Sequence, residues 1–288
     1  MLIDRENLRE LIPAIASKYN FRQGIIEKDY YLTIILNNIE LLLSNKLIFK
    51  GGTLLNKIHL NYHRLSEDLD FTYFGGETLN TRSQRSKAIV PIRERMSEFL
   101  KQLGLKSEKP KGEGFNNSTQ YIFYVTYPSF ITARDENIKI EVSLRQPPMD
   151  KPVHNTVKHF YQDPFTGDNL IPNNKILSLS FNEAVAEKLK AAITRKDKAV
   201  RDYYDLWHIA QSGFDFQNEK FIELLKKKLS NEGYHGDFRH DFGLNGGTVN
   251  LLHRHIETDL TPVIRLNEQF DLDRVFGKFN EILKSMDF

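Results

Sequence analysis

Cysteine, long apolar runs and an excess of either charge are all missing from this chain. The absence of cysteine among its 288 residues excludes disulfide bonds and thiolate metal sites, which fits a reducing compartment. The 40 basic and 38 acidic residues nearly cancel, which argues against a protein that coats nucleic acid through its overall charge. The mixture of charges from Asp4 to Glu10 lacks the basic-then-apolar order of a signal peptide. We therefore expect a cytoplasmic protein.

No apolar run reaches the length of a membrane span. The longest candidate, residues 31–43, is interrupted by Asn37, Asn38 and Glu40 and is far shorter than the roughly 20 residues that a bilayer requires. Its apolar residues recur at helical spacing, and no proline breaks the pattern. We predict a buried helix here and no association with a membrane.

A glycine pair at the end of a short apolar run is the first strong motif. Residues 47–49 predict a buried strand that ends at Gly51 and Gly52. Glycine lets the backbone approach a ligand closely. The helix predicted over residues 54–61 would offer unpaired N–H groups to an anion. This arrangement favours the binding of phosphate groups.

Two carboxylates follow on the next predicted strand, residues 68–73. Asp68 and Asp70 are two residues apart, so their side chains project from the same face. Two like charges this close are costly unless one is protonated or a cation lies between them. Magnesium prefers oxygen ligands and usually completes its shell with substrate phosphates. Together with the glycine turn, the two aspartates predict a metal-dependent nucleotide site.

Glu141 is a candidate third carboxylate, on a strand predicted over residues 137–144. It shares the polar face of that strand with Lys139 and Ser143. A single glutamate on such a face is most often only solvated. Phosphoryl transfer with two metal ions, however, needs a third carboxylate beside the first pair. Glu141 is the best candidate for this role in the sequence.

The wider pattern predicts an α+β chain in two domains. Helices are expected before residue 45 and after residue 175, and the small sheet is expected from strands over residues 47–49, 68–73, 119–127 and 137–144. A proline-rich, irregular stretch follows the last strand. We place the boundary within it, so that residues 1–165 form the core with its N-terminal helices and residues 166–288 form a helical C-terminal domain.

Further charged candidates lie on predicted helices. A helix over residues 83–103 has Pro91 either as a kink or as its start, and basic side chains that would suit RNA phosphates or an ordinary solvated face are Arg82, Arg85, Arg93, Arg95 and Lys226-Lys227-Lys228. Two later helices, over residues 181–194 and 199–211, carry Lys188 on the first and Arg201, Asp202 and Asp205 on the second. An Arg and an Asp four residues apart often form only an exposed pair of about 0.3 kcal/mol. Spacing alone leaves a functional role of this pair open.

Four separated motifs together resemble the AbiEii-type nucleotidyltransferase toxins of abortive-infection systems. In chain order they are Lys50-Gly51-Gly52-Thr53-Leu54, Arg64-Leu65-Ser66-Glu67-Asp68-Leu69-Asp70-Phe71, Glu187-Lys188-Leu189-Lys190-Ala191 and Arg201-Asp202-Tyr203-Tyr204-Asp205-Leu206. The earlier segment Glu27-Lys28-Asp29-Tyr30-Tyr31-Leu32 is similar to the N-terminal helix of that family. The resemblance extends from about residue 22 to about residue 210.

The resemblance implies a DNA polymerase β-like nucleotidyltransferase core with a small mixed sheet and N-terminal helices, followed by a C-terminal helical bundle. It implies attack of an acceptor hydroxyl on the α-phosphate of an NTP, with release of pyrophosphate and with Mg²⁺, or alternatively Mn²⁺, as cofactor. Members resemble one another as phage-defence toxins paired with an antitoxin. AbiEii itself is associated with GTP, and related toxins modify the 3′ end of tRNA. The implied donor is GTP or a pyrimidine NTP, and the implied acceptor is tRNA or another RNA.

The resemblance also assigns roles to residues of this chain. It implies metal binding by Asp68, Asp70 and Glu141, and catalysis by these three with Lys188 and Asp205. Nucleotide binding would involve Gly51, Gly52, Thr53, Arg64, Ser66, Lys188, Arg201 and Asp202, with Lys188 neutralising the β- and γ-phosphates. Arg201 and Asp205 would position that lysine or the nucleotide. The interval from Thr53 to Asp68 is longer than in many members of the wider superfamily, although it suits this branch.

Three other classes share parts of the pattern. A binding protein without transfer activity would sense a nucleotide or grip RNA, although the intact carboxylates argue against it. An enzyme that attaches AMP to protein hydroxyls would use the same metal and phosphate geometry. A glycosyltransferase with an Asp-x-Asp metal site would consume a nucleotide sugar and ignore plain NTPs. The glycine turn and the lysine helix argue against this last class.

Overall fold

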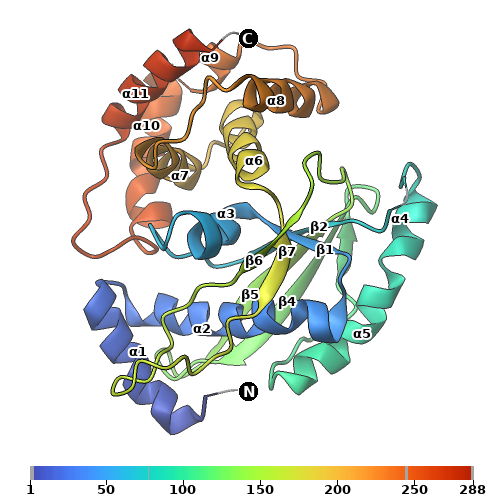
Figure 1. The fold of residues 1–288 in the computed structure, drawn as a ribbon, viewed down its shortest axis with the longest axis vertical. Coiled ribbons are helices and arrows are strands. Elements are labelled where there is room, and N and C mark those ends of the chain that lie inside the picture. The colour runs from blue at the N-terminus through green and yellow to red at the C-terminus, as the bar shows by residue number, and fades with distance from the viewer. Residues whose placement is uncertain (1–2, 77, 244–245, 287–288) are drawn as a thin grey trace. The chain divides into compact units, whose positions relative to one another are not determined.

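The computed structural model describes residues 3–76, 78–243 and 246–286 (Figure 1). The described chain divides into two compact units. Unit 1 comprises the residues up to Asn61 together with Leu65–Leu179, and unit 2 comprises Tyr62–Arg64 together with the residues from Ser180 onward. This division falls at residue 179, whereas the sequence analysis places a domain boundary after residue 165; that boundary stays a prediction.

Unit 1 is built on a seven-stranded mixed sheet with the strand order β3-β4-β5-β2-β1-β7-β6. The strands are β1 (Leu47–Lys50), β2 (Leu69–Tyr73), β3 (Glu113–Phe115), β4 (Gln120–Pro128), β5 (Asp135–Ser143), β6 (Val153–Thr156) and β7 (Lys175–Ser178). β2 pairs in parallel with β5 and antiparallel with β1, and β1 pairs in parallel with β7. The mixed α+β class is confirmed, and four strands lie where they were predicted. β3, β6 and β7 were not predicted.

Helices cover one face of this sheet. In β4, Tyr121 and Tyr127 share the buried face, and they contact helices α5 (Val90–Gln102) and α2 (Gln23–Asn38), respectively. The ring centroids of Tyr127 and Tyr31 of α2 are 4.3 Å apart, and the guanidinium of Arg93 of α5 lies 5.4 Å from the ring centroid of Tyr121. Figure 1 shows α2 crossing the strands. Because side chains alternate along a strand, the opposite face of β5 carries Lys139 and Glu141.

The remaining helices of unit 1 follow the local sequence closely. They are α1 (Arg5–Tyr19), a π-helical turn after α2 (Ile39–Leu43), α3 (Gly51–Leu54) with its π-helical extension (Leu55–His59), and α4 (Arg82–Ala88). The helix predicted over residues 54–61 therefore begins earlier, directly at Gly51. Pro91 lies in the first turn of α5, where its missing N–H has no helical partner to lose. Pro91 thus marks a helix start and not a kink.

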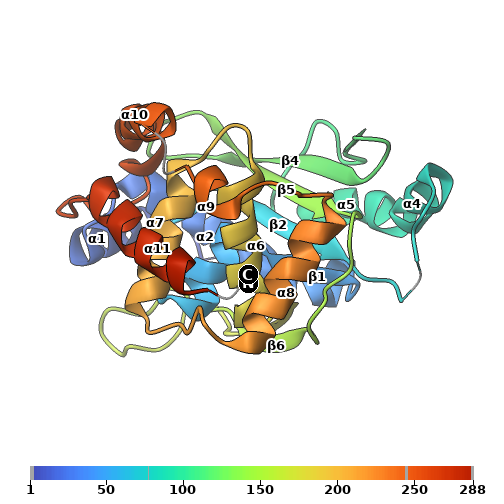
Figure 2. The same cartoon turned by 90° about the horizontal axis from the view of Figure 1, so that it is seen from above.

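Unit 2 is helical throughout its described residues apart from connecting turns. Its helices are α6 (Phe181–Thr194), α7 (Val200–Gln211), α8 (Glu219–Asn231), α9 (Phe238–Asp241), α10 (Gly246–His255) with a π-helical turn (Ile256–Leu260), and α11 (Leu272–Ser285). In Figure 2, α11 runs beside α7 and α9. The buried rings of Tyr203, Phe242 and Phe276 pack together there, with centroid distances from 5.1 to 6.1 Å. None of the helices described is both long and apolar enough to span a bilayer.

The start of α6 is capped by a side chain. The Ser180 hydroxyl accepts a hydrogen bond from the main-chain N–H of Glu183 at 3.1 Å, which satisfies one of the unpaired groups of the first turn. The carboxylate of Glu183 pairs with Lys228 of α8 at 2.7 Å. Glu183 therefore serves the packing of two helices.

Candidate functional site

Three carboxylates lie on neighbouring positions of the sheet face in unit 1 that is opposite Tyr121 and Tyr127. Asp70 of β2 and Glu141 of β5 are directly paired across the parallel ladder. Asp68 immediately precedes β2, and its Oδ2 lies 3.8 Å from Nζ of Lys139 on β5. The backbone register therefore brings together the three residues that were proposed as a metal-binding set.

The ammonium group of Lys139 lies among these carboxylates. Its Nζ is 3.8 Å from Oδ2 of Asp68 and 3.6 Å from Oε2 of Glu141. A second cation comes from Lys50, the cross-strand partner of Asp70 on β1. From the sequence, Lys139 was identified only as a neighbour of Glu141, and Lys50 was assigned no role. Lys139 could have been found from its place on the same strand face as Glu141.

The pKa values of the two aspartates reflect burial and charge. Burial raises the pKa of Asp70, and Lys50 opposes this rise. Burial likewise raises the pKa of Asp68, against the opposing charge of Lys139. Burial would lower the pKa of Lys139, yet the combined attraction of the carboxylates raises it, so Lys139 is charged near neutral pH. This face of the sheet favours a further positive charge.

Gly51 and Thr53 of α3 fix the position of these aspartates. Gly51 has φ of +80°, and a Cβ atom there would lie 2.2 Å from Oδ2 of Asp70. The Thr53 hydroxyl donates a hydrogen bond to the main-chain carbonyl of Asp68 at 2.5 Å. The glycine turn therefore packs directly against the aspartate strand. The predicted contact of Thr53 with a triphosphate stays a prediction, since its hydroxyl is used within the protein here.

The chemistry of this donor set suits a hard divalent cation, because the donors are carboxylate oxygens. In the side-chain conformations described, however, no three His, Cys, Asp or Glu residues are grouped so that they could hold a metal ion. The positions of these residues in the strand ladder suit a metal site. Their carboxylate groups, however, do not point toward one common point. Binding would require the carboxylates to turn toward one point.

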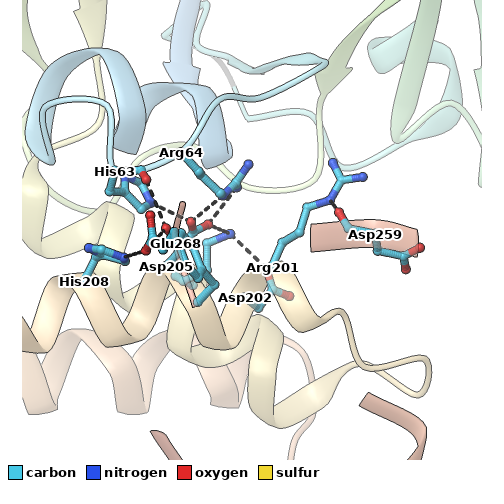
Figure 3. A network of polar contacts seen from close by, with 10 residues as sticks. His63, Arg64, Arg201, Asp202, Asp205, His208, Asp259 and Glu268 are labelled. Carbon is cyan, nitrogen blue, oxygen red and sulfur yellow. Dashed lines mark hydrogen bonds and ion pairs between the residues drawn. The ribbon is translucent and has the colours of Figure 1, made fainter. Parts of the chain in front are cut away.

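Unit 2 contains a second cluster of predicted residues, centred on Asp205 of α7 (Figure 3). The carboxylate of Asp205 is fully buried. It accepts hydrogen bonds from Nε and Nη2 of Arg64, at 2.6 and 2.9 Å. Its other close partners are Nε2 of His63 at 2.7 Å and Nζ of Lys188 at 2.9 Å. The two-pronged contact with arginine holds this carboxylate in one orientation.

Asp202 extends the cluster along α7. Its carboxylate lies 2.8 Å from Nζ of Lys188 and 2.7 Å from Nη1 of Arg195. Lys188 of α6 is thus held between two aspartates. Arg201 lies apart from this arrangement, because its Nε donates a hydrogen bond to the main-chain carbonyl of Asp259 at 2.7 Å (Figure 3). The proposed contact of Arg201 with Lys188 or a nucleotide stays a prediction.

The pKa values in this cluster have clear causes. Burial would raise the pKa of Asp205, but Arg64 and Lys188 hold it well below the usual value. Burial lowers the pKa of His63 to about 4, although its hydrogen bond to Asp205 acts in the opposite direction. Asp205 is therefore ionised and His63 neutral near pH 7. Since an ionised carboxylate only accepts hydrogen bonds, Nε2 of His63 is the donor.

His63 and its surroundings were not identified from the sequence. The Tyr204 hydroxyl donates a hydrogen bond to the main-chain carbonyl of His63 at 3.0 Å and also contacts Glu268. Arg64, predicted to bind substrate, is 3 % exposed and has its guanidinium on Asp205. Ser66, the other substrate-binding candidate of that motif, is buried. The position of His63 beside Arg64 was the available signal.

The N-terminal segment that shares the family resemblance has structural partners in unit 1. The Glu27 carboxylate accepts hydrogen bonds from the Ser129 hydroxyl and the Phe130 N–H at 2.5 and 2.9 Å. Asp29 forms a buried ion pair with Lys57 at 2.7 Å. Because Lys57 lies on the helical extension of α3, this pair ties α2 to the segment that begins at the glycine turn.

The arginines considered for RNA binding are largely engaged with the main chain. Arg85 donates to the carbonyl of Asn117 at 3.1 Å, Arg93 to that of Lys111 at 2.7 Å, and Arg95 to that of Leu42 at 2.7 Å. In the lysine run, Lys228 is buried and paired with Glu183 and Glu187. These contacts support the structural interpretation of both basic segments.

Comparisons with known proteins identify the family of this chain. A family model described as the nucleotidyl transferase AbiEii toxin of type IV toxin–antitoxin systems matches residues 34–286. The structure is similar to MenT4, a nucleotidyltransferase toxin of Mycobacterium tuberculosis, with a TM-score of 0.62 and 18 % identity over 99 % of this chain and 91 % of that chain. At that identity the likeness concerns the fold alone.

Two Helicobacter pylori structures are also similar, one described as a nucleotidyltransferase and the other as JHP933. Both have a TM-score of 0.49 and cover 92 % of this chain, with 16 % and 15 % identity and with 95 % and 92 % of their own chains covered. None of the curated proteins matches the chain. The family model spans most of the chain. This protein therefore belongs to the AbiEii family of nucleotidyltransferase toxins.

Proposed function

We propose that this enzyme transfers a nucleoside monophosphate from an NTP to an acceptor hydroxyl, with the 3′ end of tRNA as the acceptor. The observation that carries the proposal is the pairing of Asp70 with Glu141 across the β2–β5 ladder, with Asp68 on the same face. Three carboxylates at adjacent positions, next to a glycine turn that leads into a helix, are the parts that metal-assisted phosphoryl transfer requires.

The carboxylates would hold Mg²⁺, with Mn²⁺ as an alternative. A divalent ion bound there would neutralise phosphate charge and make the acceptor hydroxyl more acidic. Glu141 would accept the proton of that hydroxyl as its oxygen attacks the α-phosphorus. The bond from the α-phosphorus to the bridging oxygen then breaks, and pyrophosphate leaves.

The proposal also gives Lys188 and its partners a role toward the phosphates of the donor. Lys188 carries a positive charge between Asp202 and Asp205, and it would compensate the charge that builds up on the leaving pyrophosphate. Arg64 and His63 hold Asp205 in place. These two residues would act on the nucleotide indirectly, by fixing the carboxylate that positions Lys188.

The family resemblance supports the proposed donor and biological partner. GTP or a pyrimidine NTP would be the donor. The enzyme would act in the cytoplasm as part of phage defence, and a cognate antitoxin would inhibit it. Membership in a family of toxins from toxin–antitoxin systems supports the proposal of a cognate antitoxin. The choice of tRNA over another RNA or a protein is the part that an experiment must decide.

The test is incubation of the purified protein with Mg²⁺, total RNA and each α-³²P-labelled NTP in turn. Asp70→Asn removes one charge from the carboxylate set. Asp135→Asn makes the same chemical change at an exposed position of β5 and is the control. Label in a tRNA-sized band with wild type and Asp135→Asn, and none with Asp70→Asn, is the expected result.

Other outcomes would redirect or end the proposal. Label in proteins and not in RNA would make the enzyme a protein-modifying transferase. Equal labelling by Asp70→Asn and wild type would end the proposed mechanism. Expression in bacteria provides a second readout, since wild type should arrest growth and Asp70→Asn should not.

A further inference from the structure

Lys139 occupies a position in unit 1 that the proposed reaction does not use. Its ammonium group lies between Asp68 and Glu141, and its side chain is one-third exposed. The two N–O distances, 3.8 and 3.6 Å, exceed the roughly 2.7–3.2 Å of a close hydrogen bond. The contact is therefore mainly an attraction between charges, and about two-thirds of the side chain is covered by the protein.

A metal ion and this ammonium group would compete for the same oxygens. A Mg²⁺ or Mn²⁺ ion binds carboxylate oxygens at roughly 2.0–2.2 Å, so an ion shared by Asp68 and Glu141 would lie in the space next to Nζ of Lys139. Two positive centres that close repel each other strongly in a partly buried site. In the metal-free protein Lys139 already balances part of the charge of Asp68 and Glu141.

We infer that Lys139 acts as a built-in cation that competes with the divalent metal for Asp68 and Glu141 and thereby lowers the metal affinity of the site. The inference rests on the proposed function only in that the same carboxylates bind the metal. In the metal-free protein the ammonium group offsets the repulsion among Asp68, Asp70 and Glu141. When the divalent ion binds, the side chain of Lys139 leaves.

This dual position gives Lys139 two effects of opposite sign. Removing its charge should destabilise the metal-free protein, because three carboxylates then lie together with less compensation. The same change should tighten metal binding, because no ammonium group has to be displaced. A lysine that only supports the fold would give the first effect without the second.

The experiment is titration with Mn²⁺ in the absence of nucleotide, followed by electron paramagnetic resonance of the free ion, with thermal unfolding measured on the same samples. Lys139→Met removes the charge and keeps much of the length of the side chain. Lys139→Arg keeps the charge. Lys101→Met makes the same charge change at an exposed position of α5 and is the distant control.

We expect Lys139→Met to bind Mn²⁺ about tenfold more tightly than wild type, a shift that corresponds to one charge at partly screened contact distance. Its metal-free form should unfold at a lower temperature, and saturating Mn²⁺ should reverse that loss. Lys139→Arg and Lys101→Met should bind Mn²⁺ with the affinity of wild type. Lys139→Gln serves as a second neutral variant if the methionine impairs folding.

Asp70→Asn separates failure of this inference from failure of the proposed function. If Asp70→Asn binds Mn²⁺ as wild type does, the carboxylates are not the metal site and the proposed function loses its basis. If Asp70→Asn loses binding while Lys139→Met binds Mn²⁺ with wild-type affinity or more weakly, the metal site stands and the competition by Lys139 is overturned.

Discussion

At the scale of single residues, Gly51 is the position where backbone and carboxylate chemistry meet. Its φ of +80° is one that residues with a side chain rarely adopt. A Cβ atom there would also collide with the carboxylate of Asp70. Gly51 is thus required twice, once for its own conformation and once for the position of its neighbour.

We predict that Gly51→Ala lowers both stability and activity. Backbone strain and the forced shift of Asp70 should together cost about 2 to 4 kcal/mol in the free energy of unfolding, and displacement of a catalytic group should reduce transfer by about a hundredfold. Chemical denaturation and the RNA labelling assay measure the two effects.

Gly76→Ala is the matched control for this prediction. Gly76 has φ of +81°, and a Cβ atom there would meet nothing within 4 Å. It should therefore show the backbone cost alone, about 1 kcal/mol, with wild-type activity. Equal behaviour of the two variants would show that the contact with Asp70 has no importance.

His63 makes the stability of the protein depend on pH. Its pKa in the folded protein is about 4, against about 6.5 for an unperturbed histidine side chain. Between these values the unfolded chain binds a proton at this residue and the folded chain does not, so acid favours unfolding. The contribution of His63 to stability is complete above about pH 6.5 and is lost as pH falls toward 4.

We predict that His63→Gln shows a weaker loss of stability than wild type between about pH 7 and pH 5. The difference in that loss should be roughly 2 kcal/mol, measured by urea unfolding at each pH. His253→Gln, which changes a half-exposed histidine of α10, should follow the wild-type curve. Parallel curves for His63→Gln and wild type would contradict the prediction.

At the scale of secondary-structure elements, the alternation of apolar and polar residues predicted which residues share a strand face better than it predicted the number of strands. The apolar positions of β2 and β5 predicted both strands and the shared face of Asp68 and Asp70. The three missed strands have at most four residues each. β3 and β6 lie at the two edges of the sheet, where they need few apolar residues, and so leave little pattern to read.

The charged cluster of unit 2 could be predicted only in part. Asp205 was proposed from its helix motif, but its strongest partner, Arg64, lies 141 residues away in the chain. No periodicity connects positions that far apart, so the pairing depends on tertiary structure. Resemblance brought both residues into one set of motifs without showing that they touch.

Helices α6 and α8 are joined by a cluster of ion pairs that the run of three lysines in the sequence does not reveal. Lys228 belongs to a run of three lysines, yet its side chain is 3 % exposed and lies 2.7 Å from Glu183 of α6. Glu183 is itself buried. An ion pair in this setting leaves a costly unpaired charge when one partner is removed.

We predict that Lys228→Ala destabilises the protein by about 3 to 5 kcal/mol. Lys227→Ala, the neighbouring exposed lysine, should change stability by less than about 0.5 kcal/mol. Thermal unfolding of both variants followed by circular dichroism is the measurement. A small and equal effect in the two variants would mean that Lys228 behaves as a solvent-exposed lysine, as the run of three lysines in the sequence suggests.

At the scale of the whole molecule, the chain passes between its two units three times. It enters unit 2 for Tyr62–Arg64, returns to unit 1 at Leu65, and enters unit 2 again at Ser180. The segment Tyr62–Arg64 supplies His63 and Arg64, two partners of the fully buried Asp205. Unit 2 is therefore not encoded by one continuous segment.

We predict that residues 180–288 expressed alone do not fold into a stable helical unit. Asp205 would lose Arg64 and His63 and would keep Lys188 as its charged partner, which leaves a buried carboxylate poorly compensated. Absence of a cooperative thermal transition by circular dichroism is the expected result. A fragment that adds residues 60–66 through a glycine-serine linker should regain part of the transition, and a cooperative transition in the shorter fragment would contradict this.

The segment Tyr62–Arg64 also constrains how such proteins diverge. A recombination event that exchanged the sequence after residue 179 would bring in a new α7 while leaving the old His63 and Arg64 behind. Substitutions at these two positions and at residue 205 are therefore expected to be inherited as a set. A foreign helical half would therefore be expected to pack well only if it arrived together with residues 62–64, which lie more than a hundred residues upstream of Asp205.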